Sequence, residues 1–274
     1  MKKNILITGC SSGIGLCCAS ALRNRGYRVF ATARKKSDVK VLLQQGFESL
    51  QLDLNSSQSI ETAVSEIVER TDQQLYALFN NGAYGQPGAV EDLSRQTLKA
   101  NFETNVFGTH ELTRYIIPVM RNQGFGRIIQ NSSVLGFAAF KYRGAYVATK
   151  FALEGLTDTL RLELADTNIK LSLIEPGPIS SRFRENAFAM YKKNIDKENS
   201  FHKAYYDAVE ARLSKEGPAT AFTLPPEAVL KRLIHALESR KPKVRYYVTV
   251  PTYLFANLKR LLPHKTLDKL LGRL

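Results

Sequence analysis

The stretch Thr8-Gly9-Cys10-Ser11-Ser12-Gly13-Ile14-Gly15 decides the fold. It follows a short apolar run at residues 5–8 and precedes a helical pattern over residues 16–25. The three glycines permit a tight turn and a close approach of the backbone to a ligand. The start of the following helix offers unpaired N–H groups and the positive end of its dipole to an anion. This order of strand, turn and helix predicts a dinucleotide-binding loop that holds a pyrophosphate.

Outward from this loop, short apolar, β-branched runs alternate with helical patterns. The predicted strands cover residues 5–8, 28–32, 49–53, 76–80, 126–132, 170–174 and 245–248. Runs that are apolar on both faces are typical of parallel strands covered by helices on both sides, with right-handed crossovers. We therefore expect an α/β fold, a doubly wound parallel sheet of the Rossmann type, that forms a single domain over residues 1–274.

The composition is that of a globular chain. Of 274 residues, 44% are hydrophobic and 23% are charged, which excludes a disordered, collagenous or membrane-spanning protein. The N-terminal apolar run is too short for an export signal, and no run of about 18 apolar residues predicts a transmembrane helix. The three cysteines lie close together near the N-terminus, so they predict no disulfide framework and favour a reducing cytoplasmic location.

Positive charge is concentrated at the C-terminal end. Residues 231–274 contain 11 basic and two acidic residues, within a chain of net charge +14. No nucleic-acid-binding motif accompanies this charge, so we expect no nucleic-acid partner. Leucines recur there at helical spacing between basic residues: Leu254, Leu258, Leu261, Leu262, Leu267, Leu270, Leu271 and Leu274. This amphipathic extension, residues 250–274, would either contact an anionic membrane surface or pack on the protein.

Residues 178–224 interrupt the alternation of strands and helices. This segment is rich in Phe and Tyr and has helical patterns but no convincing strand. A strandless segment of this length in a compact domain is typically a functional lid. We expect this lid segment to cover an apolar ligand; the alternative is a disordered insertion.

The glycine spacing resembles the loop Thr-Gly-x-x-x-Gly-x-Gly of the short-chain dehydrogenase/reductase family. Further matches extend through most of the chain: Asp53 closing Leu-Gln-Leu-Asp-Leu, Asn80-Asn81-Gly82-Ala83, Asn105 in Asn-Val-Phe-Gly, Ser132-Ser133, Tyr146-Val-Ala-Thr-Lys150 and Pro176-Gly177. The family usually has Asn-Asn-Ala-Gly where this chain has Asn-Asn-Gly-Ala, a swap of two small residues. The resemblance implies these cofactor-binding residues: Gly9, Ser11, Ser12, Gly13, Ile14, Gly15, Arg34, Asp53, Leu54, Asn81, Tyr146, Lys150, Pro176, Gly177 and Ile179.

The end of the second predicted strand indicates which nicotinamide cofactor is used. An acidic residue there would bind the 2′-hydroxyl of NAD(H), whereas an arginine would accept the 2′-phosphate of NADP(H). The chain reads Ala33-Arg34-Lys35-Lys36, with no acidic residue before Asp38. We therefore expect NADP(H). In the alternative, these basic residues form only a solvated helix start.

The candidate catalytic residues are Asn105, Ser133, Tyr146 and Lys150. Tyr146 and Lys150 are four residues apart, so on a helix they share a face, and the ammonium would lower the phenol pKa. The resemblance implies that Tyr146 exchanges a proton with the substrate and that Ser133 binds the substrate oxygen. It also implies that Lys150 holds the nicotinamide ribose and that Asn105 completes a water relay. The predicted chemistry is hydride transfer.

Within this family, the chain resembles the branch of retinol and hydroxysteroid dehydrogenases and NADP-dependent aldehyde reductases. Thr-Gly-Cys-Ser-Ser-Gly-Ile-Gly, Ala-Thr-Ala-Arg and Ile-Glu-Pro-Gly-Pro-Ile carry this resemblance. It implies an apolar carbonyl or alcohol as substrate, such as a long-chain aldehyde or retinal, and a homo-oligomer. A hydroxysteroid or ketone reductase and a non-catalytic NADP(H) sensor are the alternatives. The four histidines lack metal-ligand spacing, so we predict no metal site.

Overall fold

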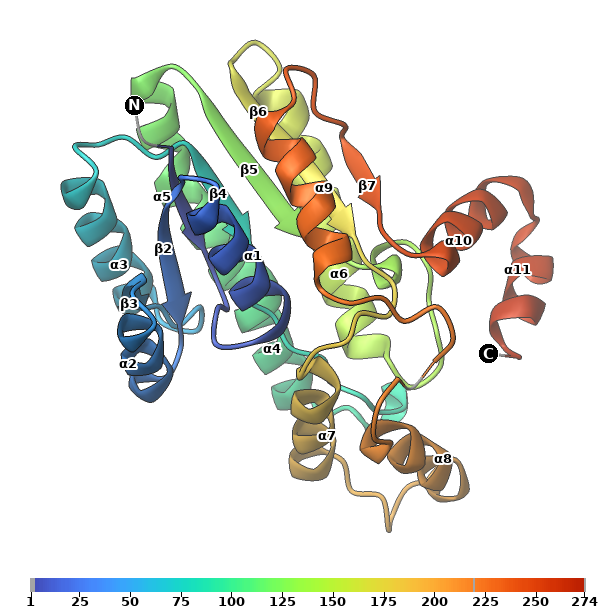
Figure 1. Ribbon diagram of the computed structural model, residues 1–274. Coiled ribbons are helices and arrows are strands. Elements are labelled where there is room, and N and C mark those ends of the chain that lie inside the picture. The colour runs from blue at the N-terminus through green and yellow to red at the C-terminus, as the bar shows by residue number, and fades with distance from the viewer. Residues whose placement is uncertain (1–2, 219, 274) are drawn as a thin grey trace.

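A computed structural model describes residues 3–218 and 220–273. Its strands form one parallel seven-stranded sheet in the order β3-β2-β1-β4-β5-β6-β7 (Figure 1). The expected doubly wound α/β fold is confirmed, and each strand end lies within two residues of its predicted position. The strands are β1 (Asn4–Ile7), β2 (Arg28–Ala33), β3 (Glu48–Gln51), β4 (Ala77–Asn80), β5 (Gly126–Asn131), β6 (Ile169–Glu175) and β7 (Arg245–Tyr247).

Helices cover both faces of the sheet. The helices on one face are α1 (Gly13–Asn24), α2 (Lys36–Gln44) and α9 (Glu227–Glu238). Those on the other face are α3 (Ser57–Arg70), α5 (Thr109–Gln123) and α6 (Gly144–Glu163), with α4 (Arg95–Phe102) leading into α5. Successive residues of a strand face opposite sides, so Ile5 and Ile7 enter one core while Leu6 enters the other.

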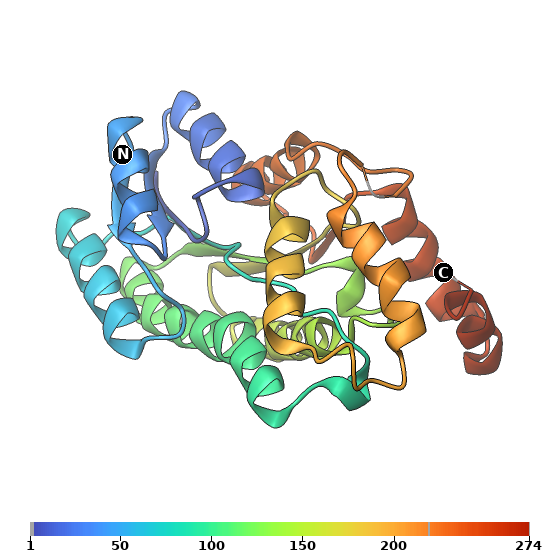
Figure 2. The ribbon, with the colours of Figure 1, turned by 90° about the horizontal axis from the view of Figure 1, so that it is seen from below.

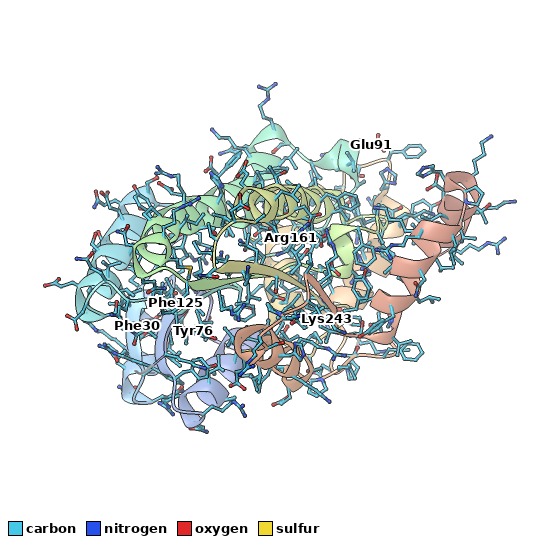
Figure 3. The ribbon with its side chains drawn as sticks, turned by 90° about the horizontal axis from the view of Figure 1, so that it is seen from above. Phe30, Tyr76, Glu91, Phe125, Arg161 and Lys243 are labelled. Carbon is cyan, nitrogen blue, oxygen red and sulfur yellow. The ribbon has the colours of Figure 1, made fainter. Side chains whose placement is uncertain are left out.

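The amino ends and the carboxyl ends of the parallel strands differ in character. At the end of the sheet where the strands begin, Tyr76 and Phe125 lie near each other in Figure 3, and their ring centroids are 6.3 Å apart. At the opposite edge, the chain leaves the neighbouring strands β1 and β4 in loops that carry the glycines and Asn81. A doubly wound sheet binds its ligands at such a carboxyl edge, where the strand order reverses.

The lid segment, residues 178–224, lies beyond this carboxyl edge. It contains α7 (Phe183–Asn194) and α8 (Lys203–Ser214), which lie side by side in Figure 2. Its two ends are joined at the base: Ile179 and Leu224 form a parallel bridge, and the Ser180 amide donates to the Leu224 carbonyl at 2.9 Å. The expected helices are therefore present, and both ends are anchored to each other.

The C-terminal extension forms α10 (Val250–Leu261) and α11 (His264–Leu271), which pack on the chain itself. Phe255 and Leu271 join a small apolar cluster with Ala138, beside the short helix η3 (Val134–Gly136). Other predicted apolar positions point outward: Leu254 is 52% exposed and Leu261 is 78% exposed. Leu274 lies outside the described residues. Across residues 3–218 and 220–273, no helix is both long and apolar enough to span a membrane.

Candidate active site

The conformation of the glycine loop requires a glycine at each of its three glycine positions. Gly9 and Gly13 have φ angles of +71° and +56°, which side-chain-bearing residues rarely adopt. A Cβ on Gly15 would lie 2.2 Å from the Gly9 carbonyl oxygen. The loop ends at Ser12, the N-cap of α1, which makes no side-chain cap hydrogen bond. The first amides of α1 are therefore available to a ligand, as the sequence predicts.

Asn81 fastens the glycine loop to the loop after β4. Its side-chain amide donates to the carbonyls of Thr8 at 3.0 Å and Gly9 at 3.2 Å. The Thr8 hydroxyl accepts from the backbone amides of Asn81 at 2.9 Å and Gly82 at 2.8 Å. These bonds hold together the loop after β1 and the loop after β4, at the place where the strand order of the sheet reverses.

Arg34, Asp53 and Leu54 lie around the ends of β2 and β3. Arg34 is exposed between β2 and α2, and Lys36 begins α2. Asp53 is partly buried and accepts from the Asn55 amide at 3.0 Å. Leu54 is buried, and a Cβ on Gly108 would lie 1.8 Å from its carbonyl oxygen. These residues follow the carboxyl ends of β2 and β3, where the sequence predicts the adenosine end of the cofactor.

Ser133, Tyr146 and Lys150 converge at the carboxyl end of β5. Ser133 follows β5, whereas Tyr146 and Lys150 occupy the first two turns of α6 and are 8% and 3% exposed. The Ser133 hydroxyl lies close enough to the Tyr146 phenol to act on its pKa. The Lys150 ammonium donates to the Asn131 carbonyl at 2.7 Å and lies 5.5 Å from the Tyr146 ring centroid. The predicted sharing of a helix face is therefore present.

The electrostatics of this triad differ from the sequence expectation. Burial raises the pKa of Tyr146 above its usual value, and the hydrogen bond with Ser133 only partly opposes that rise. Burial also lowers the pKa of Lys150 to about 8, although Glu154 acts to raise it. The expected lowering of the phenol pKa is wrong for this arrangement, because burial is the largest cause and raises the pKa, and Lys150 is not among the groups that shift it.

Asn105 lies in a π-helical turn, η2 (Glu103–Gly108), between α4 and α5. Its side chain donates to the Tyr84 carbonyl at 2.9 Å and to the Thr149 hydroxyl at 3.1 Å, and accepts from the Tyr84 amide at 3.1 Å. Turns of this kind are rare and often occur at functional sites. The structure therefore ties Asn105 to α6 one residue before Lys150, and its side chain is occupied by these partners.

A buried network of carboxylates lies behind Lys150. The Ser132 hydroxyl donates to Glu154 at 2.6 Å, and Arg245 bridges Glu154, Glu175 and Asp158. Glu175 is fully buried, and burial and the charge of Glu154 raise its pKa. The network holds the Glu154 carboxylate close enough to Lys150 to favour its charged form and so raise its pKa.

The segment after β6 connects the site to the lid. The Pro176 carbonyl accepts from the Val134 amide at 2.8 Å and from the Ser133 hydroxyl at 3.4 Å. A Cβ on Gly177 would lie 2.1 Å from the Thr249 hydroxyl oxygen, so the backbone passes α10 closely. Ile179, at the start of the lid segment, then forms the bridge with Leu224.

In the lid itself, Phe183 opens α7 and lies against the catalytic candidates. Its ring centroid is 5.2 Å from that of Tyr146 in an edge-to-face contact. A Cβ on Gly85 would lie 3.0 Å from the same ring. Phe183 is one of the aromatic residues that favour a lid in the sequence, and its contact with Tyr146 brings this segment next to the candidate catalytic residues.

Asn131 is an important residue of the site that sequence reasoning missed. Its carbonyl accepts from Lys150, and its side chain donates to the Asn81 side-chain oxygen at 2.9 Å. It therefore links the lysine to the glycine loop. A signal was available, because Gln130 and Asn131 follow two isoleucines and place polar side chains at the carboxyl end of a strand. Elsewhere, no group of three or more His, Cys, Asp or Glu residues arranged for a metal occurs among residues 3–218 and 220–273.

Comparison with known proteins agrees with this architecture. Residues 3–192 match the family described as short chain dehydrogenase. The chain is 43% identical over 271 residues to the uncharacterized oxidoreductase YbbO of Escherichia coli (strain K12), covering 99% of this chain and 94% of that protein. It is 32% identical to human 17-beta-hydroxysteroid dehydrogenase type 1, covering 89% and 77%. It is 31% identical to human retinol dehydrogenase 8, covering 89% and 80%.

Among solved structures, a short-chain dehydrogenase from Streptomyces avermitilis superposes with a TM-score of 0.79 at 26% identity. The superposition covers 99% of this chain and 97% of that one. The similarity therefore extends through the lid segment and the C-terminal extension.

Proposed function

The chain belongs to the short-chain dehydrogenase family of oxidoreductases, and from that premise we propose that it transfers a hydride between NADP(H) and an apolar carbonyl or alcohol. The proposed direction is the reduction of long-chain aldehydes or retinal-like compounds. The observation that carries the proposal is the contact of Phe183 with Tyr146, because it places an apolar wall beside the proton-donating hydroxyl.

The glycine loop fits the cofactor, since it lets the backbone approach a ligand closely. A side chain at Gly15 would collide with the Gly9 carbonyl oxygen and prevent this conformation. Proposed contacts to the phosphates and the nicotinamide half come from the loop residues 9 and 11–15 and from Asn81, Pro176, Gly177 and Ile179. Asp53 and Leu54 would border the adenine. NADPH supplies the hydride when bound. Tyr146 and Lys150 would face its ribose.

Preference for NADP(H) rests on Arg34. A guanidinium is a rigid fork of donors that suits a phosphate, and no acidic side chain lies between Arg34 and Asp38 to repel one. Replacing Arg34 with serine should raise the KM for NADPH about tenfold or more and leave that for NADH little changed. Lys35→Ser, the exposed neighbour at the N-cap of α2, is the matched control. Equal effects on both cofactors would contradict the assignment.

Proton transfer is proposed to run through Tyr146. With its pKa raised by burial, the phenol stays protonated at neutral pH and is ready to donate to the oxygen of a carbonyl undergoing reduction. Ser133, which lies close enough to act on the Tyr146 phenol, would donate to the same oxygen. Lys150 remains charged below about pH 8 and would favour the phenolate left behind. Asn105 would hold the adjoining relay in place.

The substrate class follows from the lid. Phe183 presents an apolar surface, and the relatives named above include a retinol dehydrogenase and a hydroxysteroid dehydrogenase. These names support an apolar carbonyl and keep a steroid or other ketone as the second candidate. A non-catalytic NADP(H) sensor is disfavoured, because Ser133, Tyr146 and Lys150 are brought together.

Location and association are part of the proposal. We place the protein in the cytoplasm, where its free cysteines would stay reduced. The exposed Leu254 and Leu261 lie near Lys259 and Arg260, and this face of α10 would contact an anionic membrane. Flotation with anionic vesicles, compared with neutral ones, tests that contact. A homo-oligomer is proposed from the family resemblance, and sedimentation of the purified protein tests it.

The decisive test of function is NADPH consumption with carbonyl compounds graded from short and polar to long-chain aldehydes, retinal and steroid ketones. We expect turnover to rise with apolar length and Tyr146→Phe to reduce kcat by about 10²–10⁴-fold. NADPH binding to that variant, followed by cofactor fluorescence, controls for misfolding. Faster turnover of short polar carbonyls would refute the substrate class, and binding without any turnover would favour the sensor.

A further inference from the structure

Three arginines gather around the lid without compensating charge. Arg143 is the N-cap of α6, three residues before Tyr146; Arg184 follows Phe183 on α7, and Arg212 lies on α8. All three are partly buried. Burial and then the charge of Arg212 lower the pKa of Arg143 to about 10, and burial and the charge of Arg184 lower the pKa of Arg212. Contacts between the elements also place the three arginines in one region. The ring of Tyr142, the neighbour of Arg143, lies 5.9 Å from that of Tyr206 on α8, and Arg184 donates to the Lys215 carbonyl, three residues beyond Arg212.

The acidic residues of the lid helices are engaged elsewhere. On α7, Glu185 pairs with Arg182 at 3.3 Å. On α8, Asp207 and Glu210 both pair with Lys197, at 2.6 and 2.9 Å. None of these carboxylates contacts the arginine cluster.

The acidic network of α6 is directed away as well. Glu154 and Asp158 both pair with Arg245, about three and four helical turns further along α6 than Arg143. Within residues 3–218 and 220–273, none of the three clustered arginines forms an ion pair with a carboxylate. The cluster thus keeps its positive charge.

The arginine cluster also keeps a hydrogen-bond donor that has no partner. Arg184 donates through Nη2 to the backbone carbonyls of Lys215 and Gly217, the latter at 2.8 Å, and its buried Nε has no partner. Arg143 lies 5.4 Å from the Phe140 ring centroid, which orients its guanidinium but supplies no anion. A buried donor without a partner costs free energy, and like charges held together add to that cost.

Such an arrangement is stabilised when an anion binds. Arginine binds carboxylates and phosphates through paired N–H donors, and the start of α6 contributes a partial positive charge beside Arg143. The cluster lies within one helical turn of Tyr146, through Arg143, and adjoins the Phe183 wall, through Arg184. An apolar chain along Phe183 could therefore carry an anionic group to the arginines.

We propose that Arg143, Arg184 and Arg212 bind an anionic group, a carboxylate or a phosphate, carried by the apolar carbonyl substrate. The substrate is then amphipathic, with its carbonyl at Tyr146 and its charge at the cluster. This inference rests on the proposed function for the carbonyl, but the anion site has its own binding test.

The kinetic test compares ω-oxo fatty acids with their methyl esters at matched chain lengths. Wild-type protein should prefer the acids in kcat/KM by about tenfold or more at one optimal length, and Arg212→Gln should bring the ratio of acid to ester close to one. Arg182→Gln, also at the start of α7 but already paired with Glu185, should keep the wild-type ratio. Equal rates for acid and ester in the wild type, or an unchanged ratio in Arg212→Gln, would overturn the proposal.

Calorimetric binding separates this inference from the proposed function. Dodecanoate and dodecyl phosphate should each bind the wild type more tightly than methyl dodecanoate does, and Arg212→Gln should lose that difference. The tighter of the two identifies the anion. Binding of inorganic phosphate alone, with no preference for either amphiphile, would refute an anion carried by the substrate. Should no carbonyl compound be reduced, the proposed function fails, and this binding preference still decides the anion site.

Discussion

The catalytic floor and the lid segment are held by different forces. The floor, meaning Ser133, Tyr146 and Lys150 with the glycine loop, is fixed by buried hydrogen bonds such as that from Lys150 to the Asn131 carbonyl, at 2.7 Å. The lid segment is fixed by an aromatic cluster of its own, centred on Tyr191 and Tyr206. Polar bonds in a buried setting allow one geometry, whereas packed rings tolerate substitution.

Exposure shows the same contrast. Lys150 is 3% exposed, whereas Phe201, Tyr205 and Phe222 of the lid segment are 88%, 60% and 61% exposed. Elements with few buried contacts open at low free-energy cost. The comparison teaches that the proposed proton transfer would rest on buried residues of the floor, Tyr146 and Lys150, whereas the lid segment combines a buried cluster of its own with exposed rings.

Gly15→Ala should have the largest effect, because it adds an atom to the glycine loop, which is part of the rigid floor. The new Cβ would lie 2.2 Å from the Gly9 carbonyl oxygen and 2.8 Å from the Asn81 side-chain nitrogen, and neither atom can move without breaking the loop. We expect NADPH to bind about a hundredfold more weakly. Fluorescence titration measures this. Binding within a few-fold of the wild type would show that the floor is softer than its contacts indicate.

Phe183→Ala should act next most strongly, and only on substrate. Loss of the ring that contacts Tyr146 removes apolar surface worth about 1.4 kcal/mol, so kcat/KM for long-chain aldehydes should fall about tenfold. The affinity for NADPH should stay as it is. Phe201→Ala, which removes an 88% exposed ring of the same segment, is the matched control and should change neither quantity. Equal losses in both variants would contradict a specific role for Phe183.

Sequence reasoning succeeded where local patterns carry the information. The sheet, its strands, the family and its retinol and hydroxysteroid dehydrogenase branch are confirmed, since strand runs and the glycine loop are contiguous. The contacts of Asn131 and Phe183 were missed because they join residues far apart in the chain. The pKa of Tyr146 was misjudged because spacing reveals the neighbouring lysine but not the depth of burial.

Glu154→Gln should produce a smaller, pH-dependent effect on the floor. The Glu154 carboxylate favours the charged form of Lys150, whose pKa is already lowered by burial to about 8. The ammonium is present below that pH and is lost above it, so the activity of the wild type should decline above about pH 8. Removing the carboxylate lowers the pKa further and should move the decline to lower pH by about one unit.

The measurement for this variant is the pH profile of kcat/KM. Glu163→Gln, at the exposed end of the same helix, should keep the wild-type profile. A decline at higher pH in Glu154→Gln would mean that the carboxylate acts on another group, such as Arg245, rather than on Lys150.

Gly82→Ala should have the smallest effect on NADPH affinity. It tests whether the rigid part of the floor extends beyond the glycine loop. A Cβ at Gly82 would lie 3.3 Å from the Thr8 hydroxyl oxygen and 3.4 Å from Leu54 Cδ1, so shifts of a few tenths of an ångström relieve the contact. The backbone bond from Gly82 to the Thr8 hydroxyl, at 2.8 Å, does not depend on the side chain. NADPH affinity should therefore change by less than about twofold. A loss comparable to that of Gly15→Ala would mean that the whole crevice, and not the glycine turn alone, tolerates no added atom.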